Sequence, residues 1–315
     1  MSETNRSGII VLDKPAGLSS NRVLECLKRV LGLPGGRAAR SGGAAKLGYL
    51  GTLDPLATGV LPVFVGKATR LIPAFEGLDK TYRVELRLGR RTETFDAEGA
   101  VIAEADPGGV SEGDLRAALA SFGTGYEQRV PRFSAVKVGG VPAYRLARAG
   151  REVPERVRPV RLLALALEDF SLPLATLRVT ASAGTYVRSL VDDLGQRLGV
   201  GAHVTALRRL ACGSLFTLEN SITLEQIEGA VARGDFGFVQ NPTAYLPQYL
   251  PLQVEDAAER QLRDGRTIPL PEDTAPPQPA AKVMALRPCG TLIAIGAVVP
   301  TGTGAWGFQP SKVLV

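Results

Sequence analysis

One short run constrains the fold and chemistry of this chain more than any other feature. Residues 51–62 read GTLDPLATGVLP, so a single carboxylate, Asp54, lies among small, apolar and hydroxyl-bearing residues. An Asp-Pro pair is typical of a helix start, with Asp54 at the N-cap and Pro55 at the first helical position. Here Pro62 would stop such a helix within two turns, and glycines bracket the run, so we predict a shaped loop. A carboxylate held on such a loop is a candidate nucleophile or general base.

Composition narrows the class of protein. With 315 residues the chain has room for one large and one small domain. Its net charge of +6 agrees with a polyanionic partner without requiring one. Three widely spaced cysteines and a single histidine, His203, exclude an ordinary zinc site and a disulfide framework, and fit a reducing cytosol. The apolar run at 8–12 is too short for a signal peptide or a membrane span, so we expect a cytoplasmic protein with no membrane partner.

Apolar periodicity predicts alternating strands and helices over the first three quarters of the chain. The predicted strands are 9–12, 82–88 and 177–183, and the predicted helices are 20–30, 115–122 and 187–198, the first capped by Ser19 or Ser20. The stretch 32–47 is rich in Gly, Ala and Arg and is expected to be a mobile basic loop.

The pattern of predicted elements changes after Tyr249. A short helix is predicted over 255–263 and strands over 283–286 and 292–299, while the proline-rich stretch 269–279 excludes regular structure. We therefore divide the chain into domains at 1–249 and 250–315.

Two further segments hold candidate site residues, each with a plain structural alternative. Tyr82 lies on the apolar face of its predicted strand and could be an ordinary core tyrosine. Arg188, at the start of a predicted helix, could form a surface pair with Asp192 one turn later. Alternatively, its guanidinium could hold Asp54 in a bidentate ion pair that fixes the direction of the carboxylate.

Four blocks of this sequence together resemble the TruB-type tRNA pseudouridine synthases. The blocks are the 51–62 run, KTYRV at 80–84, GTYVRSL at 184–190 and GAHVTALRRL at 201–210. The resemblance implies an α+β pseudouridine synthase fold, with a mixed, largely antiparallel sheet and a small C-terminal PUA-like β-barrel. It also implies isomerisation of uridine 55 in the T-loop of tRNA to pseudouridine after the base is flipped out.

The resemblance also assigns roles to individual residues. Asp54 would be the catalytic nucleophile and Arg188 its charge partner, whereas the atom that Asp54 attacks stays open. Tyr82 would pack on the target uracil, Leu207 would form an apolar wall, and Tyr186 would contact the substrate. Where the family carries Gly-His-Thr-Gly, this chain has Gly48-Tyr49-Leu50-Gly51, so Tyr49 would stack on a base or ribose instead.

A basic segment over 128–151 is the predicted RNA-clamping region. A solvated basic helix would account for its charge equally well. In the family this region closes over the T-arm of tRNA, which would make Lys137, Arg145, Arg148 and Arg151 phosphate contacts.

Other classes of function are weaker. Residues 59–67 imitate a phosphate-binding loop, but the glycines are too far apart and Ala68 replaces the expected Ser or Thr. Isomerisation needs no cofactor and no metal, and we expect a monomer. The alternatives are an RNA-binding or tRNA-folding chaperone on the same scaffold and a guide-RNA-dependent relative of the family.

Overall fold

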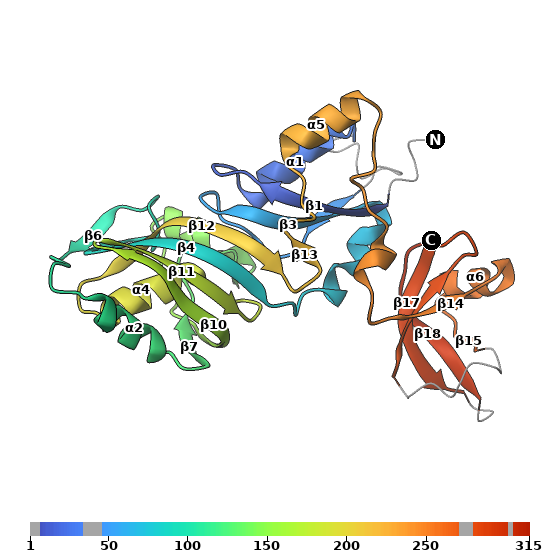
Figure 1. Cartoon of the computed structure of the whole chain (residues 1–315). Coiled ribbons are helices and arrows are strands. Elements are labelled where there is room, and N and C mark those ends of the chain that lie inside the picture. Colours follow the sequence, from blue (N-terminus) through green and yellow to red (C-terminus); the bar gives the residue numbers. More distant parts are fainter. Residues whose placement is uncertain (1–6, 34–45, 271–279, 302–304) are drawn as a thin grey trace.

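The computed structural model describes residues 7–33, 46–270, 280–301 and 305–315, and its larger part is built on one nine-stranded sheet (Figure 1). The strands of this sheet are β1 (Gly8–Lys14), β2 (Leu47–Tyr49), β3 (Thr58–Val65), β4 (Lys80–Leu88), β7 (Gly125–Arg129), β10 (Val157–Ser171), β11 (Leu174–Ala181), β12 (Ala202–Cys212) and β13 (Phe216–Thr217). Their order is β1-β3-β12-β4-β11-β10-β7, with β2 beside β3 and β13 beside β12. Only the pairing of β12 with β3 is parallel. The predicted mixed, largely antiparallel sheet is therefore confirmed.

Helices cover one face of this sheet. They are α1 (Ser20–Val30), α2 (Glu112–Ala120), α4 (Val187–Arg197) and α5 (Leu224–Ala232). The 3-10 turns η3 (Gly66–Ala74) and η4 (Pro242–Tyr245) pack on the other face, and a shorter helix, α3, covers Ala143–Arg148. Helices α1 and α5 lie near the β1 end, and α2 and α4 lie at the β7 end (Figure 1). The predicted N-cap is confirmed, because the Ser19 hydroxyl accepts from the Arg22 N–H.

Strand β1 shows how the sheet serves two apolar cores. Successive side chains of a strand point to opposite faces. Ile10 and Leu12 join the core beneath the helices, whereas Ile9 and Val11 join a second core on the other face, which includes Phe64. A run of apolar residues without alternation is thus expected for a strand that is buried on both sides.

The 51–62 run is partly loop and partly strand, whereas the sequence predicted a loop throughout. Residues 51–57 form an irregular loop, as predicted, but β3 begins at Thr58, so Pro62 lies inside a strand opposite Val11. The Pro62 carbonyl still accepts a hydrogen bond from the Leu50 N–H. The strand therefore tolerates the absence of an N–H donor at Pro62. The loop is therefore shorter than predicted and is anchored directly by a central strand.

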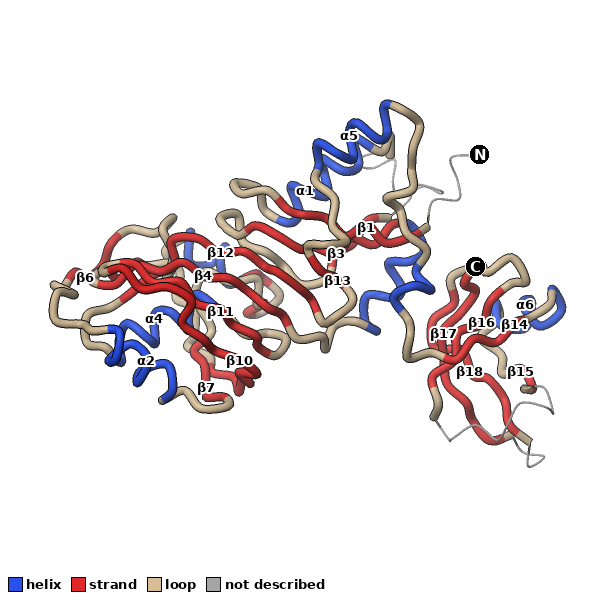
Figure 2. Tube along the Cα trace, in the orientation of Figure 1, coloured by secondary structure: helices blue, strands red, loops and turns tan. Residues whose placement is uncertain are grey.

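The chain after Leu250 forms a separate five-stranded sheet that curls in the manner of a small PUA-like barrel (Figure 2). Its elements are β14 (Leu250–Gln253), α6 (Asp256–Arg263), β15 (Ile268–Pro269), β16 (Lys282–Leu286), β17 (Leu292–Pro300) and β18 (Trp306–Val313). Two separate hairpins lie earlier in the chain: β5 (Arg90–Thr92) pairs with β6 (Val101–Glu104), and β8 (Lys137–Val138) pairs with β9 (Val141–Pro142). The helix and both strands predicted here are confirmed. Pro269 corrects one prediction, because it closes β15 instead of opening an irregular stretch.

The remaining predictions for this part of the chain concern loops and boundaries. The rest of the proline-rich stretch, and most of the loop predicted at 32–47, lie outside the described residues. Leu292, Ile295 and Leu314 pack into the same apolar cluster as Phe64 and Leu71, so the two sheets share a core. The division into domains at residue 249 stays a prediction. In the described part of the chain, no helix is long and apolar enough to cross a membrane.

Candidate active site

The loop that carries Asp54 is held by donors that reach its backbone from three directions. The Ser20 hydroxyl both donates to the Leu53 carbonyl and accepts from the Leu53 N–H, each at 2.9 Å. Arg209, which is 1% exposed, donates to the Gly51 carbonyl at 2.9 Å and to the Val60 carbonyl at 2.6 Å. These contacts replace the sheet pairing that the loop lacks, and they fix the backbone on either side of Asp54.

Lys14 closes the third side of this loop from the end of β1. Its side chain is fully buried, and Nζ donates to the carbonyls of Pro15, Leu18 and Pro55 at 2.7, 2.6 and 3.4 Å. Burial lowers the pKa of Lys14 to about 8, although the charge of nearby Asp54 opposes this shift. The turn that enters α1 and the Asp54 loop are thus joined through one buried ammonium.

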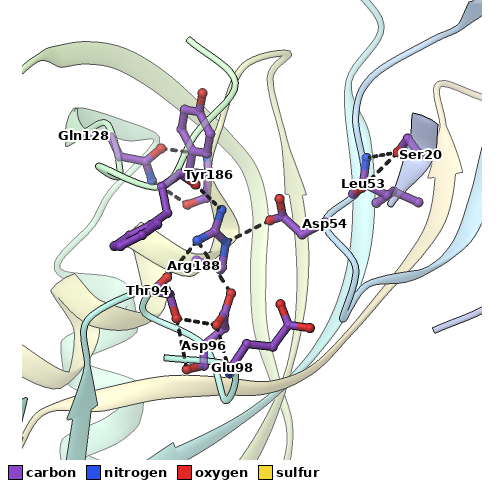
Figure 3. Close-up of polar contacts among 10 residues, drawn as sticks. Ser20, Leu53, Asp54, Thr94, Asp96, Glu98, Gln128, Tyr186 and Arg188 are labelled. Atoms are coloured by element: carbon purple, nitrogen blue, oxygen red, sulfur yellow. Dashed lines mark hydrogen bonds and ion pairs between the residues drawn. The ribbon is translucent and has the colours of Figure 1, made fainter. Parts of the chain in front are cut away.

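Arg188 contacts Asp54 directly, as Figure 3 shows. The Nε atom of Arg188 lies 2.8 Å from Oδ2 of Asp54, and the two side chains are 5% and 39% exposed. Within the described residues no donor contacts Oδ1 of Asp54. The surface pairing of Arg188 with Asp192 is wrong, because Asp192 instead accepts two hydrogen bonds from Arg91.

Arg188 and Asp54 share one hydrogen bond, which corrects the expectation of a bidentate ion pair. The other guanidinium nitrogens are engaged elsewhere: Nη1 donates to the Thr94 carbonyl at 2.7 Å and Nη2 to the Phe133 carbonyl at 3.1 Å. Three segments that are far apart in the sequence therefore meet at one side chain. This geometry holds the guanidinium plane rigidly and leaves one nitrogen to orient the carboxylate.

A second carboxylate, Asp96, lies on the far side of Arg188 and was missed by the sequence reasoning. Its Oδ2 is 3.6 Å from Nη1 of Arg188, and its side chain is 4% exposed. The Thr94 hydroxyl and the Glu98 N–H both donate to Asp96 Oδ1 (Figure 3). Burial, together with the charges of Asp96 and Asp54, raises the pKa of Glu98. Nothing in the sequence around residue 96 indicates that Asp96 faces Arg188, because this contact depends on the path of the turn after β5.

A cavity of about 310 Å³ opens beside Asp54 and Arg188. Tyr82, Tyr186 and Leu207, to which the resemblance assigns contacts with the substrate, all line this cavity, and those contacts stay a prediction. Tyr82 and Leu207 come from neighbouring strands, and both are less than a tenth exposed. Burial raises the pKa of the Tyr82 phenol, so the ring stays neutral in this wall.

Tyr186 reaches the cavity at the N-cap of α4, where Gln128 fixes its backbone. The Gln128 amide donates to the Tyr186 carbonyl at 3.0 Å and accepts from its N–H at 2.8 Å. Tyr49 is not brought to the cavity: it lies on β2, and its hydroxyl is 3.4 Å from Asn21 Oδ1. Stacking by Tyr49 on the substrate stays a prediction. His203, to which the sequence assigned no chemistry, contacts the Arg90 carbonyl instead of the cavity.

The basic segment extends from the rim of this cavity. Lys137, Arg145, Arg148 and Arg151 are all exposed, and the guanidinium groups of Arg145 and Arg148 lie about 6 Å from the centre of the Tyr144 ring. The segment forms the β8–β9 hairpin and the short α3, so the alternative of one solvated basic helix describes only part of it. Whether these side chains contact phosphates stays a prediction.

No cluster of three or more metal-ligating side chains occurs among the described residues. The titratable groups of the site are instead arranged as carboxylates around a buried guanidinium. Such an arrangement can orient a nucleophile or a base against a bound ring without a metal ion.

Two sequence models of one family match the chain in succession. The model of the N-terminal domain of TruB family pseudouridylate synthases matches residues 39–187. The model of the C-terminal domain of tRNA pseudouridylate synthase B matches residues 188–250. The boundary between them falls inside α4, and both ranges supply strands to the nine-stranded sheet.

Relatives that match most of the chain agree with these models. The tRNA pseudouridine synthase B of Cupriavidus metallidurans is 42% identical over 86% of this chain and 83% of its own length. That of Pseudomonas aeruginosa is 47% identical over 72% of this chain and 71% of its own length.

Solved structures share the fold. A chain in the structure of an H/ACA RNP bound to a substrate RNA containing 2′-deoxyuridine has a TM-score of 0.69 and is 24% identical. The match covers 98% of this chain and 86% of that chain. A chain of a Cbf5–Nop10–Gar1 complex has a TM-score of 0.68 with 26% identity, and covers 98% of this chain and 85% of that chain.

Lys14→Met tests the buried ammonium through the pH dependence of stability. Because the folded pKa of Lys14 is about 8, the unfolded chain binds more protons between that pH and the ordinary value of 10.5. The free energy of unfolding should therefore rise with pH across this window, by up to about 1.4 kcal/mol per pH unit. The Met variant lacks this titration, so its stability should rise less in denaturant titrations between about pH 8 and about pH 10. Parallel curves for the two proteins would contradict the assignment.

Proposed function

Because the chain belongs to the TruB family of pseudouridine synthases, we propose that it isomerises a uridine of tRNA to pseudouridine. The observation that carries this proposal is the contact of Asp54 with Arg188 at a cavity lined by Tyr82 and Leu207. A cavity of about 310 Å³ is at the lower end of the range for small-molecule sites, and it has room for a single flipped base. The proposed substrate position is uridine 55, in the T-loop.

The reaction begins with a base that must leave its stack. Flipping costs a few kcal/mol, which stacking on Tyr82 and burial against Leu207 offset. Asp54 then acts on the nucleotide through its free oxygen while Arg188 holds the other one. The bond from N1 to the ribose breaks, the uracil turns in the cavity, and C5 forms the new bond to the same ribose carbon. C5 loses a proton and N1 gains one, so the product is an isomer of the substrate.

The remaining parts of the proposal concern how the RNA is held and where the enzyme acts. We infer that the basic segment binds phosphates of the T-arm and that the C-terminal sheet adds contacts along the tRNA. The enzyme would work as a monomer in the cytoplasm. The chaperone alternative is not favoured, because Asp54, Tyr82 and Arg188 are all present and surround one cavity.

Asp54→Asn should abolish turnover while leaving tRNA affinity within about threefold, since one carboxylate is a small part of the RNA contacts. The assay is tritium release from a tRNA transcript that carries 5-tritiated uridine, with purified protein and no guide RNA. Activity of the unaltered protein in this assay also separates it from a guide-dependent enzyme. Asp106→Asn, an exposed aspartate outside the cavity, serves as the control. Pseudouridine formation above about a thousandth of the normal rate by Asp54→Asn would remove Asp54 from the mechanism.

Asp96→Asn should lower the single-turnover rate about ten- to a hundredfold without changing tRNA affinity. The amide keeps the hydrogen bonds from Thr94 and Glu98 but removes the charge that faces Arg188. Arg188 would then hold Asp54 less firmly in its reactive direction. A variant that loses affinity and rate in equal measure would show that Asp96 supports folding of the site instead.

Binding should depend steeply on salt, because phosphate contacts release counterions. The log–log slope should be about −0.7 for each neutralised phosphate of single-stranded RNA and about −0.9 on a duplex. Replacing Arg148 and Arg151 together by Ala should flatten this slope and weaken binding, with little effect on the rate in the bound complex. Replacing Arg22 and Arg116, exposed arginines paired with Glu25 and Glu112, is the matched control. An affinity that does not change between about 50 and 200 mM salt would refute electrostatic binding.

A further inference from the structure

Two buried cations, Lys80 and Arg209, lie in the cavity wall beside Tyr82. Lys80 and Tyr82 are two residues apart on β4, so their side chains share a face of the sheet. Arg209 lies opposite Tyr82 on β12 and two residues beyond Leu207. Lys80 is 7% exposed and Arg209 is 1% exposed, and both line the cavity that holds Asp54.

Neither cation has a carboxylate partner among the described residues. Arg209 is occupied by backbone carbonyls of the Asp54 loop and of β3. The Lys80 ammonium has a single hydrogen bond there, to the Leu78 carbonyl, although it carries three donors. Buried charges in proteins are usually paired, so an unpaired ammonium in a binding cavity suggests that a ligand completes it.

The surroundings of Lys80 agree with this interpretation. Burial lowers the pKa of Lys80, and the neighbouring Arg209 lowers it further, while Cys212, Asp79 and Glu76 act in the opposite direction. Burial in this wall and the nearby Arg209 therefore disfavour the positive charge of Lys80. A negative charge that enters the cavity is stabilised more strongly than it would be in water, because few solvent dipoles screen it there.

We propose that the Lys80 ammonium stabilises the negative charge that develops on the uracil when its bond to the ribose breaks, an inference that rests on the proposed function. When the C1′–N1 bond breaks, its electron pair stays on the ring and spreads over N1 and the carbonyl oxygens. Lys80 donates a hydrogen bond to this anion and transfers no proton. When C5 bonds to C1′, the charge returns to the new bond, and the C5 proton is lost as N1 is protonated.

The other buried cations near Asp54 are less suited to this role. The Lys14 ammonium is surrounded by three carbonyls and is absent from the cavity lining. Arg209 uses Nη2 to hold the Asp54 loop and Nε to hold β3, so its replacement would disturb the loop itself. Among the described residues the Lys80 ammonium donates only to the Leu78 carbonyl, so its replacement removes no hydrogen bond to the Asp54 loop.

Lys80→Met should lower the single-turnover rate of pseudouridine formation by about a hundredfold or more, which is typical for loss of one donor to a developing anion. The affinity for tRNA should stay within about threefold, because the charge appears only during the reaction. Lys80→Arg restores a cation and should recover the rate to within about tenfold of the unaltered protein. Lys67→Met, which replaces an exposed lysine of η3 outside the cavity, is the control.

A substrate with a better leaving group separates a role in charge stabilisation from a structural one. Fluorine at C5 makes the uracil ring more acidic, so its anion needs less help from the enzyme. The defect of Lys80→Met, measured as consumption of 5-fluorouridine in the tRNA under single-turnover conditions, should be at least about tenfold smaller than its defect with uridine. A disturbed fold would slow both substrates by the same factor.

The outcomes distinguish this inference from the proposed function. Equal defects with the two substrates, or a Lys80→Arg variant as slow as Lys80→Met, would overturn the role of Lys80. A loss confined to tRNA affinity would also overturn it and would assign the ammonium to a phosphate of the bound RNA. If instead the unaltered protein forms no pseudouridine, the proposed function fails. Thermal unfolding checks the variants, and Lys80→Met should melt no lower than the unaltered protein, since it removes an unpaired buried charge.

Discussion

The buried guanidinium of Arg188 is the interaction on which the rest of the site depends. It joins the Asp54 loop, the turn after β5 and the segment before β8 by hydrogen bonds to Asp54, Thr94 and Phe133. A charge that is 5% exposed is stable only if its partners stay in place. The cost of breaking any one of these contacts is therefore high, and three segments that are remote in sequence are held in one arrangement. Helix α4 positions the charge, because Arg188 lies in its first turn.

Buried cations also explain how an irregular loop can be rigid. A loop beside a central strand has carbonyls that no neighbouring strand satisfies, and leaving them buried without donors would be costly. Lys14 and Arg209 supply those donors from β1 and β12, and Ser20 adds a hydroxyl from α1. The sheet thus fixes the Asp54 backbone through side chains where it cannot do so through pairing. Carboxylates take no part in this support of the loop, and two of them, Asp54 and Asp96, flank Arg188 instead.

The sequence predicted local structure well where one physical signal dominated. Strand β4, helix α4 and the capped helix α1 follow from periodicity and from Ser19, and the loop at Asp54 follows from its Gly and Pro residues. The meeting of Asp54 with Arg188 was one of two open alternatives, and only the packing of α4 against β12 decides between them. Asp96 and Lys80 could not be assigned from the sequence. Asp96 depends on the path of a turn, and Lys80 depends on strand register, which places it beside Tyr82 and opposite Cys212.

The segment that carries the basic side chains is also the segment that contacts Arg188, and this links RNA binding to the chemistry. The Phe133 carbonyl accepts from Arg188, Ser134 lies in the cavity wall, and Lys137 follows on the exposed hairpin. Under the proposed function, phosphates bound at the hairpin restrict the same backbone that holds the guanidinium. Part of the free energy of binding the tRNA is then used to order Asp54 against the flipped base and does not appear as affinity. An RNA fragment too short to reach Arg148 should therefore react more slowly even when it saturates the enzyme, because the part of the substrate that orders the site is missing.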